Sequence, residues 1–360
     1  MDGRFPILRF LVGLAVLLLL GGCATGASPT PAPPTPTPVS AVQTPVPGAT
    51  AAETPTPTTA TPAPTGSAVA ATTDVSYEST DPLLWPGKLD VYAPVKAGSW
   101  PVVVMFPGSG LSKDFLAGFA RGVAELGFVA FVADWGHSAQ ATGVVPNYQE
   151  LVADTAQGAC AVAFAQSNAT QYGGDPATII LFGHSAGANE ATMIAFLRPA
   201  PTAGCLGGTE VGPIHALVTW EGDFLLADPV WNSTLAADPR PVDAITPWKY
   251  LAGQKDLKVV MLVSDDPGAN MATPLSDAKA ADAFFKVRDP SGDLRTRLEA
   301  MGALADGSVS VTDEQELLLA ALKAQGNPVS LDVMPGSSHT YLSDAGRKVF
   351  LAAFGKAVSD

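Results

Sequence analysis

Short, continuous apolar runs alternate with longer stretches of helical spacing through most of the chain after residue 85. A continuous apolar run is typical of a strand that is buried on both faces of a parallel sheet. The first such strands are predicted at residues 102–106, 128–133 and 178–182, with helices between them at 114–126 and 147–167. This alternation predicts an α/β fold with a doubly wound, mostly parallel sheet and helices on both of its faces.

The same alternation continues to the end of the chain. The pattern predicts a helix at 188–197, strands at 214–220 and 258–263, a helix at 312–325, a strand at 329–333 and a last helix at 341–358, with edge strands at 75–77 and 88–94. The helix at 312–325 has well-marked ends. Thr312 and Gln315 have the spacing of a capping box, and Gly326 and Pro328 follow the last turn.

The first 22 residues have a different pattern. Arg4 and Arg9 precede an uncharged run at 10–22, which is shorter than the roughly 20 apolar residues that a bilayer-spanning helix needs. This order predicts a signal peptide for export. The residues from Leu20 to Cys23 resemble a bacterial lipobox, which implies that Cys23 is lipidated and anchors the protein to the outer face of the cell membrane. An ordinary secretory signal and an uncleaved anchor are the alternatives.

Residues 23–73 are built largely of Thr, Pro and Ala and contain one charged residue, Glu53. Such a segment has little apolar surface to bury, and its prolines favour extended, solvated conformations. We expect a disordered tether here. Residues 74–360 then form the folded domain.

The chain carries 20 Lys and Arg residues against 34 Asp and Glu residues, a formal net charge of −14. An acidic domain without a cluster of basic residues argues against nucleic acid as a partner and against direct adhesion to anionic lipid. Membrane attachment would therefore depend on the lipid of Cys23. The sequence also has no metal-ligand spacing, phosphate loop or dinucleotide fingerprint, so we expect no metal and no cofactor. The oligomeric state is left open.

The motif Gly183-His184-Ser185-Ala186-Gly187 lies between the strand at 178–182 and the helix at 188–197. A buried strand that runs directly into a helix needs a sharp turn, and glycines allow the backbone to pass closely there. A serine at the centre of this turn projects above the carboxyl end of the sheet. Ser185 is therefore the candidate nucleophile.

The segment from Tyr172 to Gly187, together with the order of the predicted elements, resembles the α/β-hydrolase superfamily, in particular its carboxylesterase and esterase/lipase branches. The resemblance covers nearly all of residues 85–358. It implies an eight-stranded, mostly parallel sheet with a small cap or long loops. It also implies a catalytic triad of Ser, Asp or Glu, and His in that chain order.

The base of such a triad follows the last strand. Of the four histidines, His339 lies in a Gly- and Ser-rich loop directly after the strand predicted at 329–333, and it is the expected base. His184 adjoins the nucleophile but is expected to support the turn. His137 and His215 are expected to have structural roles.

The resemblance places the acid after the strand predicted at 258–263, where Asp265 and Asp266 are adjacent. Asp266 is preferred over Asp265 because it immediately precedes a proline, as in many esterases of this branch. Glu221 and Asp223, after the preceding strand, occupy a known alternative location for the acid. All four carboxylates stay candidates from sequence alone.

A tetrahedral intermediate needs backbone donors that stabilise its oxyanion. One donor is expected to be the amide of Ala186, at the amino end of a helix. The second is expected in the loop at 107–110, from Gly108 or Ser109. This loop departs from the His-Gly-Gly-Gly sequence of related enzymes, which leaves the choice between the two residues open.

Cys160 and Cys205 are the two cysteines that follow Cys23. An even pair in an exported domain suggests a disulfide. The resemblance supports this pairing, because family members place the helices before and after the motif side by side. Two buried, reduced thiols are the alternative.

Residues 221–257 and 267–311 are longer than minimal connections and are expected either to form pocket or cap elements or to pack against the body of the domain. The function that the resemblance implies is a tethered serine esterase that acts on a small-molecule or polymer ester through an acyl-enzyme. The same residues could act on an amide, peptide or other acyl bond. A non-catalytic binding lipoprotein with this fold is the rival from another class.

Overall fold

The computed structural model describes residues 68–78, 87–136, 147–225, 235, 237–266, 272–275, 278–289 and 292–359. Its centre is an eight-stranded sheet in the order β1-β2-β4-β3-β5-β6-β7-β10. These strands are β1 (Val69–Ser76), β2 (Lys88–Pro94), β3 (Trp100–Phe106), β4 (Val129–Ala133), β5 (Gly174–His184), β6 (Ala216–Trp220), β7 (Lys258–Asp266) and β10 (Val329–Ser338). β1, β2 and β4 pair antiparallel and the remaining pairs are parallel. The predicted architecture is confirmed.

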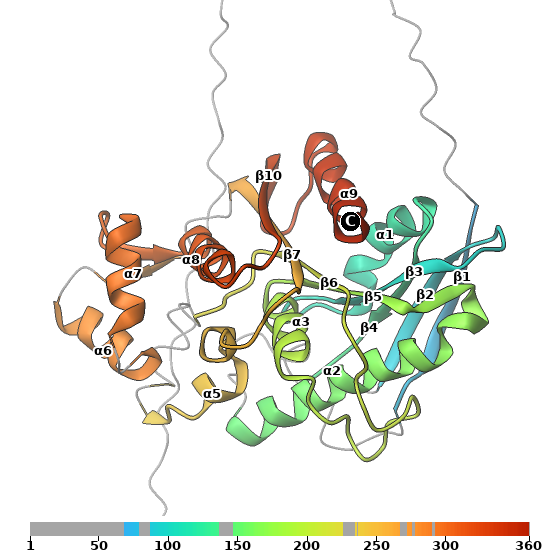
Figure 1. Ribbon diagram of the computed structural model, residues 1–360, viewed down its shortest axis with the longest axis horizontal. Helices are drawn as coiled ribbons and strands as arrows, with labels where there is room; N and C mark the ends of the chain where they lie inside the picture. The colour runs from blue at the N-terminus through green and yellow to red at the C-terminus, as the bar shows by residue number, and fades with distance from the viewer. Residues whose placement is uncertain are drawn as a thin grey trace, which may run out of the picture. The chain divides into compact units, whose positions relative to one another are not determined.

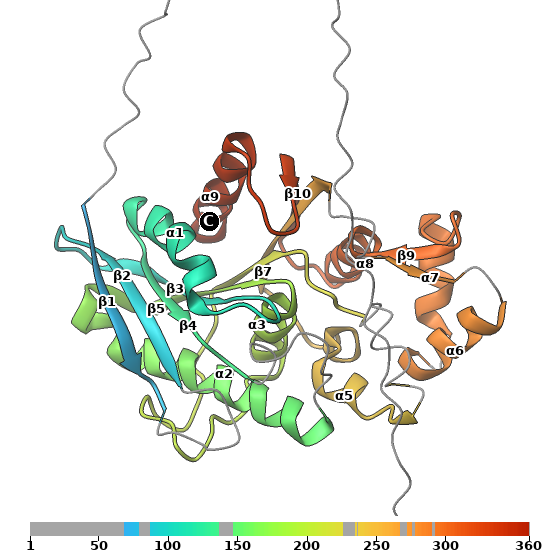
Figure 2. The ribbon, with the colours of Figure 1, turned by 180° about the vertical axis from the view of Figure 1, so that it is seen from behind.

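Helices cover both faces of this sheet (Figure 1). The helices α1 (Lys113–Glu125) and α9 (Asp344–Val358) pack on one face, where Leu116 and Phe350 join one apolar cluster with Phe182 of β5. The helices α2 (Tyr148–Asn168), α3 (Ala186–Leu197) and α8 (Val311–Ala324) pack on the other face. Figure 2 shows the ribbon from behind, with α1 and α9 above the sheet and α2 and α3 below it. The central strands are therefore buried on both sides, which explains their continuous apolar sequences.

The chain between β7 and α8 forms a small structure of its own, which we call the insert (residues 272–310). It contains β8 (Ala272–Pro274), α6 (Ala278–Arg288), α7 (Asp293–Met301) and β9 (Ser308–Ser310), and β8 pairs antiparallel with β9. Phe284, Phe285 and Leu298 form an apolar cluster with Leu225, from the loop after β6, and with Leu317 of α8. The insert thus packs against the body of the domain through α8 (Figure 1). Between β6 and β7 lie the short helix α5 (Pro241–Ile245) and the 3-10 turn η2 (Pro247–Tyr250), and the turn η1 (Ala169–Tyr172) precedes β5.

The ends of several elements differ from the predicted ones, and two differences at β1 and α8 have a clear physical reason. β1 begins at Val69 and pairs with β2 from Pro94 backwards, so the residues just before Asp74 belong to the sheet. β1 is an edge strand with mostly exposed side chains, which explains why its sequence has no apolar alternation. The capping box of α8 consists of Ser310 and Asp313, so the box predicted from Thr312 and Gln315 is wrong.

The predicted disulfide is present. Cys160 of α2 is bonded to Cys205, in the loop after α3, and their Cα atoms are 5.3 Å apart. The bridge ties together the segments that precede and follow the β5–α3 turn.

Cys23 and the predicted signal and tether lie outside the described residues, apart from the start of β1. No described helix has the length and apolar character that crossing a bilayer requires.

Candidate active site

The turn from β5 into α3 has the geometry that the Gly183–Gly187 motif predicts. Ser185 joins the strand to the helix with φ 56° and ψ −125°, a conformation that non-glycine residues rarely adopt and that surrounding structure must hold in place. A Cβ atom on Gly183 would lie 2.0 Å from the carbonyl oxygen of Gly187. A Cβ atom on Gly187 would lie 2.2 Å from the carbonyl oxygen of Phe106 in β3. Both glycines are therefore required by the close passage of the backbone.

The structure pairs His339 with Glu221. His339 follows β10, as predicted, and its Nδ1 donates to Oε2 of Glu221 over 2.7 Å. Glu221 is the first residue after β6, is fully buried and has φ 49°. A proton on Nδ1 leaves the lone pair of Nε2 available, and an imidazole in this tautomer can accept a proton.

Glu221 is held in place from the neighbouring strand. Its Oε1 accepts hydrogen bonds from the backbone N–H of Ser264, over 2.5 Å, and from the hydroxyl of the same residue. Burial alone would raise the pKa of Glu221, but the hydrogen bonds from His339 and Ser264 outweigh burial and lower it below its ordinary value. The side chain is therefore a carboxylate at neutral pH and can stabilise positive charge on the imidazole.

The prediction that Asp266 orients His339 is wrong. β7 continues as a strand through Asp266, which is aligned with Ser338 of β10 and is exposed to solvent. The adjacent Asp265 instead accepts hydrogen bonds from the backbone N–H groups of Gly336 and Ser337, over 2.7 and 3.0 Å, and these bonds lower its pKa. Asp265 thus fixes the loop that leads to His339, while Glu221 supplies the carboxylate at the imidazole.

His184 connects this loop to the serine turn. Its Nε2 donates to the carbonyl oxygen of His339 over 2.7 Å, and the centroids of the two rings are 4.7 Å apart. The ring also packs 4.5 Å from Trp220. Burial, followed by the proximity of His339, lowers the pKa of His184 to about 3. His184 therefore stays neutral and supports the turn, as the sequence predicts.

His215 lies just before β6, where its amide donates to the carbonyl oxygen of Ile179 over 2.8 Å. It is thus at the amino end of the sheet, away from the serine turn. His137 lies outside the described residues.

Two of the three predicted oxyanion donors, Ala186 and Gly108, lie next to Ser185. Ala186 is the first residue of α3, where backbone N–H groups have no partner within the helix. Gly108 is buried against the serine, since a Cβ atom on it would lie 2.9 Å from Cβ of Ser185 and 2.9 Å from Nδ1 of His184. Ser109 is exposed. The loop after β3 therefore passes directly beside the serine, and the identity of its donor stays a prediction.

Two side chains that follow β4 hold this loop, and sequence reasoning missed both. Nε1 of Trp135 donates to the carbonyl oxygen of Pro107 over 3.0 Å. Oδ1 of Asp134 accepts a hydrogen bond from the backbone N–H of Lys113, the first residue of α1, over 2.6 Å. Both ends of the loop between β3 and α1 are thus tied to one dipeptide, whose only sequence signal is its place directly after a buried strand.

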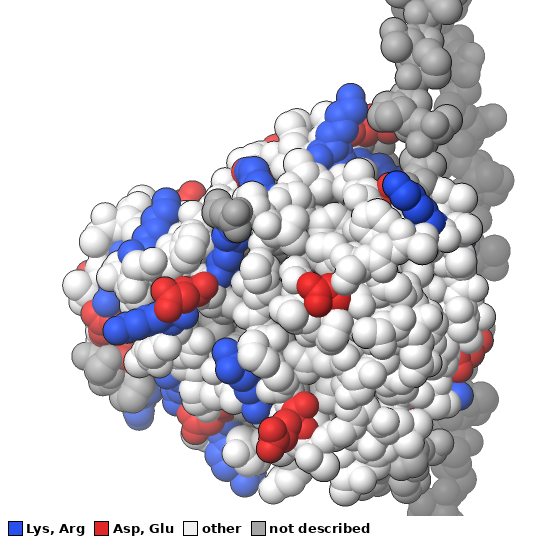
Figure 3. Space-filling view, turned by 45° about the vertical axis from the view of Figure 1, so that its right-hand side comes forward, with Lys and Arg blue, Asp and Glu red and all other residues white. Residues whose placement is uncertain are grey.

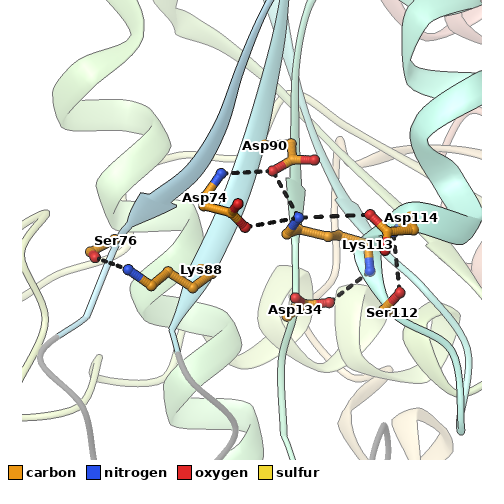
Figure 4. Close-up of polar contacts among 8 residues, drawn as sticks. All are labelled: Asp74, Ser76, Lys88, Asp90, Ser112, Lys113, Asp114 and Asp134. Atoms are coloured by element: carbon orange, nitrogen blue, oxygen red, sulfur yellow. Dashed lines mark hydrogen bonds and ion pairs between the residues drawn. The ribbon is translucent and has the colours of Figure 1, made fainter.

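The side chain of Lys113 adds an ionic contact to the first two strands (Figure 4). Its Nζ lies 3.0 Å from Asp90 of β2, 3.1 Å from Asp74 of β1 and 3.7 Å from Asp114. Burial alone would lower the pKa of Lys113, but the hydrogen bonds to Asp90 and Asp74 outweigh it and raise the pKa above its ordinary value. Lys113 therefore stays charged and joins the start of α1 to the sheet edge.

Among the residues that the structure describes, no group of three or more His, Cys, Asp or Glu side chains could hold a metal ion. The arrangement has the parts for acyl transfer by a serine, namely a hydroxyl on a strained turn, an imidazole paired with a buried carboxylate, and the start of a helix and the Gly108 backbone next to the serine.

Comparisons with known proteins identify one family model and a set of similar solved structures. The family model described as BD-FAE matches residues 89–204, which include Gly108 and Ser185. Esterase 2 from Thermogutta terrifontis, solved with propionate bound, is similar over 81% of this chain and 93% of that chain, with 16% identity and a TM-score of 0.52. The butyrate-bound form has the same identity and coverage and a TM-score of 0.53. The form phosphorylated by paraoxon covers 80% of this chain and 92% of that chain, with 16% identity and a TM-score of 0.51.

No curated protein matches the sequence. At the identity found for the solved structures, the likeness shows the fold, which is that of the α/β-hydrolases. The fold class predicted from the sequence is thereby confirmed. The solved structures named above are forms of one esterase.

Proposed function

We propose that the protein is a serine hydrolase of carboxylic esters, in which Ser185 is the nucleophile, His339 the base and Glu221 the acid. The observation that carries the proposal is the 2.7 Å hydrogen bond from His339 to the buried carboxylate of Glu221, in a loop that His184 joins to the serine turn. A serine hydroxyl is a weak nucleophile until a neighbouring base removes its proton. An oriented imidazole beside the turn is the group required for this.

In the first step Oγ of Ser185 forms a bond to the ester carbonyl carbon, and its proton passes to Nε2 of His339. The carbonyl electron pair moves to oxygen, where the amides of Ala186 and of Gly108 or Ser109 stabilise the negative charge. Glu221 stabilises the imidazolium that forms. The tetrahedral intermediate then reforms its C=O bond as the bond to the alcohol oxygen breaks, and His339 returns the proton to that oxygen.

The acyl group is now bonded to Oγ of Ser185. In the second step a water molecule attacks this ester while His339 takes the proton of the water. The second tetrahedral intermediate releases the acid and regenerates the serine hydroxyl with the same proton. No metal ion or cofactor has a role in this sequence.

The similar esterase 2 structures contain propionate and butyrate, so short acyl chains are the first substrates to test. Acidic and basic side chains are interspersed on the face seen in Figure 3, and no extended area of blue gathers among the residues coloured there. The formal net charge of −14 supports an uncharged or weakly charged ester over a polyanion as substrate. We also propose that Cys23 carries the lipid that holds the enzyme at the cell surface.

Labelling with paraoxon tests the nucleophile directly, because esterase 2 of Thermogutta terrifontis has been solved phosphorylated by this compound. The full-length chain is incubated with paraoxon and digested, and the peptides are analysed by mass spectrometry. We expect the added phosphoryl group on the peptide that contains Ser185, with loss of p-nitrophenyl acetate hydrolysis. The proposal is contradicted if the Ser185 peptide carries no label and paraoxon leaves the rate of ester hydrolysis unchanged.

A further inference from the structure

The backbone that follows Glu221 is held by side chains from three helices outside the sheet. Glu221 has φ 49°, a conformation that costs free energy and persists when neighbouring contacts fix it. On its amino side, the N–H of Glu221 donates to the carbonyl oxygen of Leu262 over 3.1 Å. The contacts on its carboxyl side come from α8, α6 and α3.

Gln315 of α8 makes the first of these contacts. It is fully buried, and its Nε2 donates to the carbonyl oxygen of Gly222 over 2.6 Å. Because Ser310 and Asp313 form the capping box of α8, the side chain of Gln315 is not used at the helix end and reaches the loop after β6. A Cβ atom on Gly222 would lie 2.5 Å from the ring of Phe224, so the loop is closely packed where Gln315 holds it.

Both backbone polar groups of Leu225, the N–H and the carbonyl oxygen, have side-chain partners. Its N–H donates to Oε2 of Glu314 over 2.8 Å, and its carbonyl oxygen accepts from Nε of Arg288 over 2.6 Å. Arg288 belongs to α6 of the insert, is 2% exposed and stacks over the ring of Phe284 at 3.9 Å. Burial, followed by the charge of nearby Asp223, raises the pKa of Glu314 well above its ordinary value.

Asn189 of α3 completes the set, because its Nδ2 donates to the carbonyl oxygen of Asp223. The backbone of the segment 222–225 is thus held at Gly222, Asp223 and Leu225 by buried polar side chains. Any buried loop needs hydrogen-bond partners for its backbone polar groups. In this loop the partners are side chains from three separate helices, α3, α6 and α8. All of them act within four residues of the strained Glu221, and Gln315 acts on the residue next to it.

We propose that Gln315 is a positioning residue for Glu221, and that Glu314 and Arg288 extend the same support, so that α8 and the insert set the orientation of the catalytic acid. The inference rests on the proposed function. Gln315 acts through the carbonyl of Gly222. Removal of the Gln315 side chain is therefore expected to slow the chemical step rather than to weaken ester binding.

The test compares Gln315→Met with Gln254→Met in the full-length chain. Methionine keeps the length of glutamine, removes the donor and adds no charge. Gln254 is a matched control, because its Nε2 also donates to backbone carbonyls, those of Phe196 and Tyr250, away from the serine turn. We expect Gln315→Met to lower kcat for p-nitrophenyl acetate on the order of 10- to 100-fold with KM little changed, as for a displaced catalytic group. Gln254→Met should keep the wild-type kcat.

A second comparison separates positioning from general loss of structure. Gln315→Met is introduced into the Glu221→Gln variant, which has already lost the carboxylate at position 221. If Gln315 acts through Glu221, the double variant has the kcat of Glu221→Gln alone, because the two residues work as a unit. An equal proportional loss in both backgrounds overturns the proposal, since it would show an effect independent of the acid.

Two other outcomes also overturn it, and they are distinguishable. A wild-type kcat for Gln315→Met beside a damaged Glu221→Gln refutes the positioning role and leaves the proposed function intact. A wild-type kcat for Glu221→Gln refutes the assignment of the acid and the positioning role together. If Gln315→Met does not fold, as judged by circular dichroism, Gln315→Ala replaces it, because the smaller side chain leaves room for a water at the Gly222 carbonyl.

Discussion

Nδ1 of His339 lies 2.7 Å from Oε2 of Glu221, a residue that follows β6 and is fully buried. Asp266, at the end of β7, is exposed, and the neighbouring Asp265 binds backbone amides in the loop before His339. Glu221 therefore faces the imidazole, and Asp265, near the end of β7, holds the loop before His339. This division of roles leads to distinct mutational effects.

Glu221→Gln should lower kcat on the order of 10²- to 10⁴-fold, because an imidazole that has lost its carboxylate partner is neither oriented nor stabilised as an imidazolium. Asp266→Asn should leave kcat within a small factor of the wild type. Steady-state hydrolysis of p-nitrophenyl acetate measures both. A large loss of kcat in Asp266→Asn together with a wild-type kcat in Glu221→Gln would show that the acid assignment is wrong.

Ser185→Ala and His339→Ala should each lower kcat on the order of 10³-fold or more while the fold is retained. The double variant should be little worse than either single variant, because a base without its nucleophile contributes little to the rate. Circular dichroism checks the fold and the ester assay gives the rates. Undiminished hydrolysis by Ser185→Ala would exclude Ser185 as the nucleophile.

The fold and the serine turn were predictable because their signals are local. The strands around β5 are buried on both faces and read as continuous apolar runs, and the turn at Ser185 needs glycine at Gly183 and Gly187 whatever surrounds it. The position of His339 also follows locally, from a Gly- and Ser-rich loop after the last strand. These features depend on residues that are close in the sequence.

The acid could not be chosen in this way. Carboxylates follow both β6 and β7, and which one reaches His339 depends on the path of the β10 loop and on how far β7 continues as a strand. The role of Gln315 could not be predicted from local sequence either. Its spacing from Thr312 suggested a local cap, but its partner is the carbonyl of Gly222. Contacts between residues far apart in sequence decided both cases.

Reduction of the Cys160–Cys205 bridge should lower thermal stability more than it changes kcat. The bridge closes a loop across a sequence separation of 45 residues, for which the chain-entropy model gives roughly 4 kcal/mol. It ties α2 to the chain after α3 and touches neither Ser185 nor His339. Thermal unfolding and ester hydrolysis are compared with and without reductant, with Cys160→Ala/Cys205→Ala as the second arm. A large fall in kcat without a fall in Tm would contradict this expectation.

Glu190, on the helix that begins after Ser185, should make stability depend on pH. The residue is buried, and its Oε2 accepts a hydrogen bond from the hydroxyl of Thr155 over 3.1 Å. Burial, followed by the charge of Asp154, raises the pKa of Glu190 to about 8. An unfolded chain has an ordinary Glu pKa of about 4.3. Between these two values the folded protein holds a proton that the unfolded chain has lost.

The contribution of Glu190 to stability is thus complete below about pH 4.3 and falls as pH rises toward 8, by about 1.4 kcal/mol per pH unit. Glu190→Gln keeps the shape and the neutral charge of the protonated side chain, so this variant should lack that part of the slope and be more stable than the wild type near pH 7.5. Urea unfolding from pH 5 to 7.5 gives both slopes, with the exposed Glu125→Gln as the matched control. Equal slopes for the wild type and Glu190→Gln would mean that Glu190 is already ionised in the folded protein across this range.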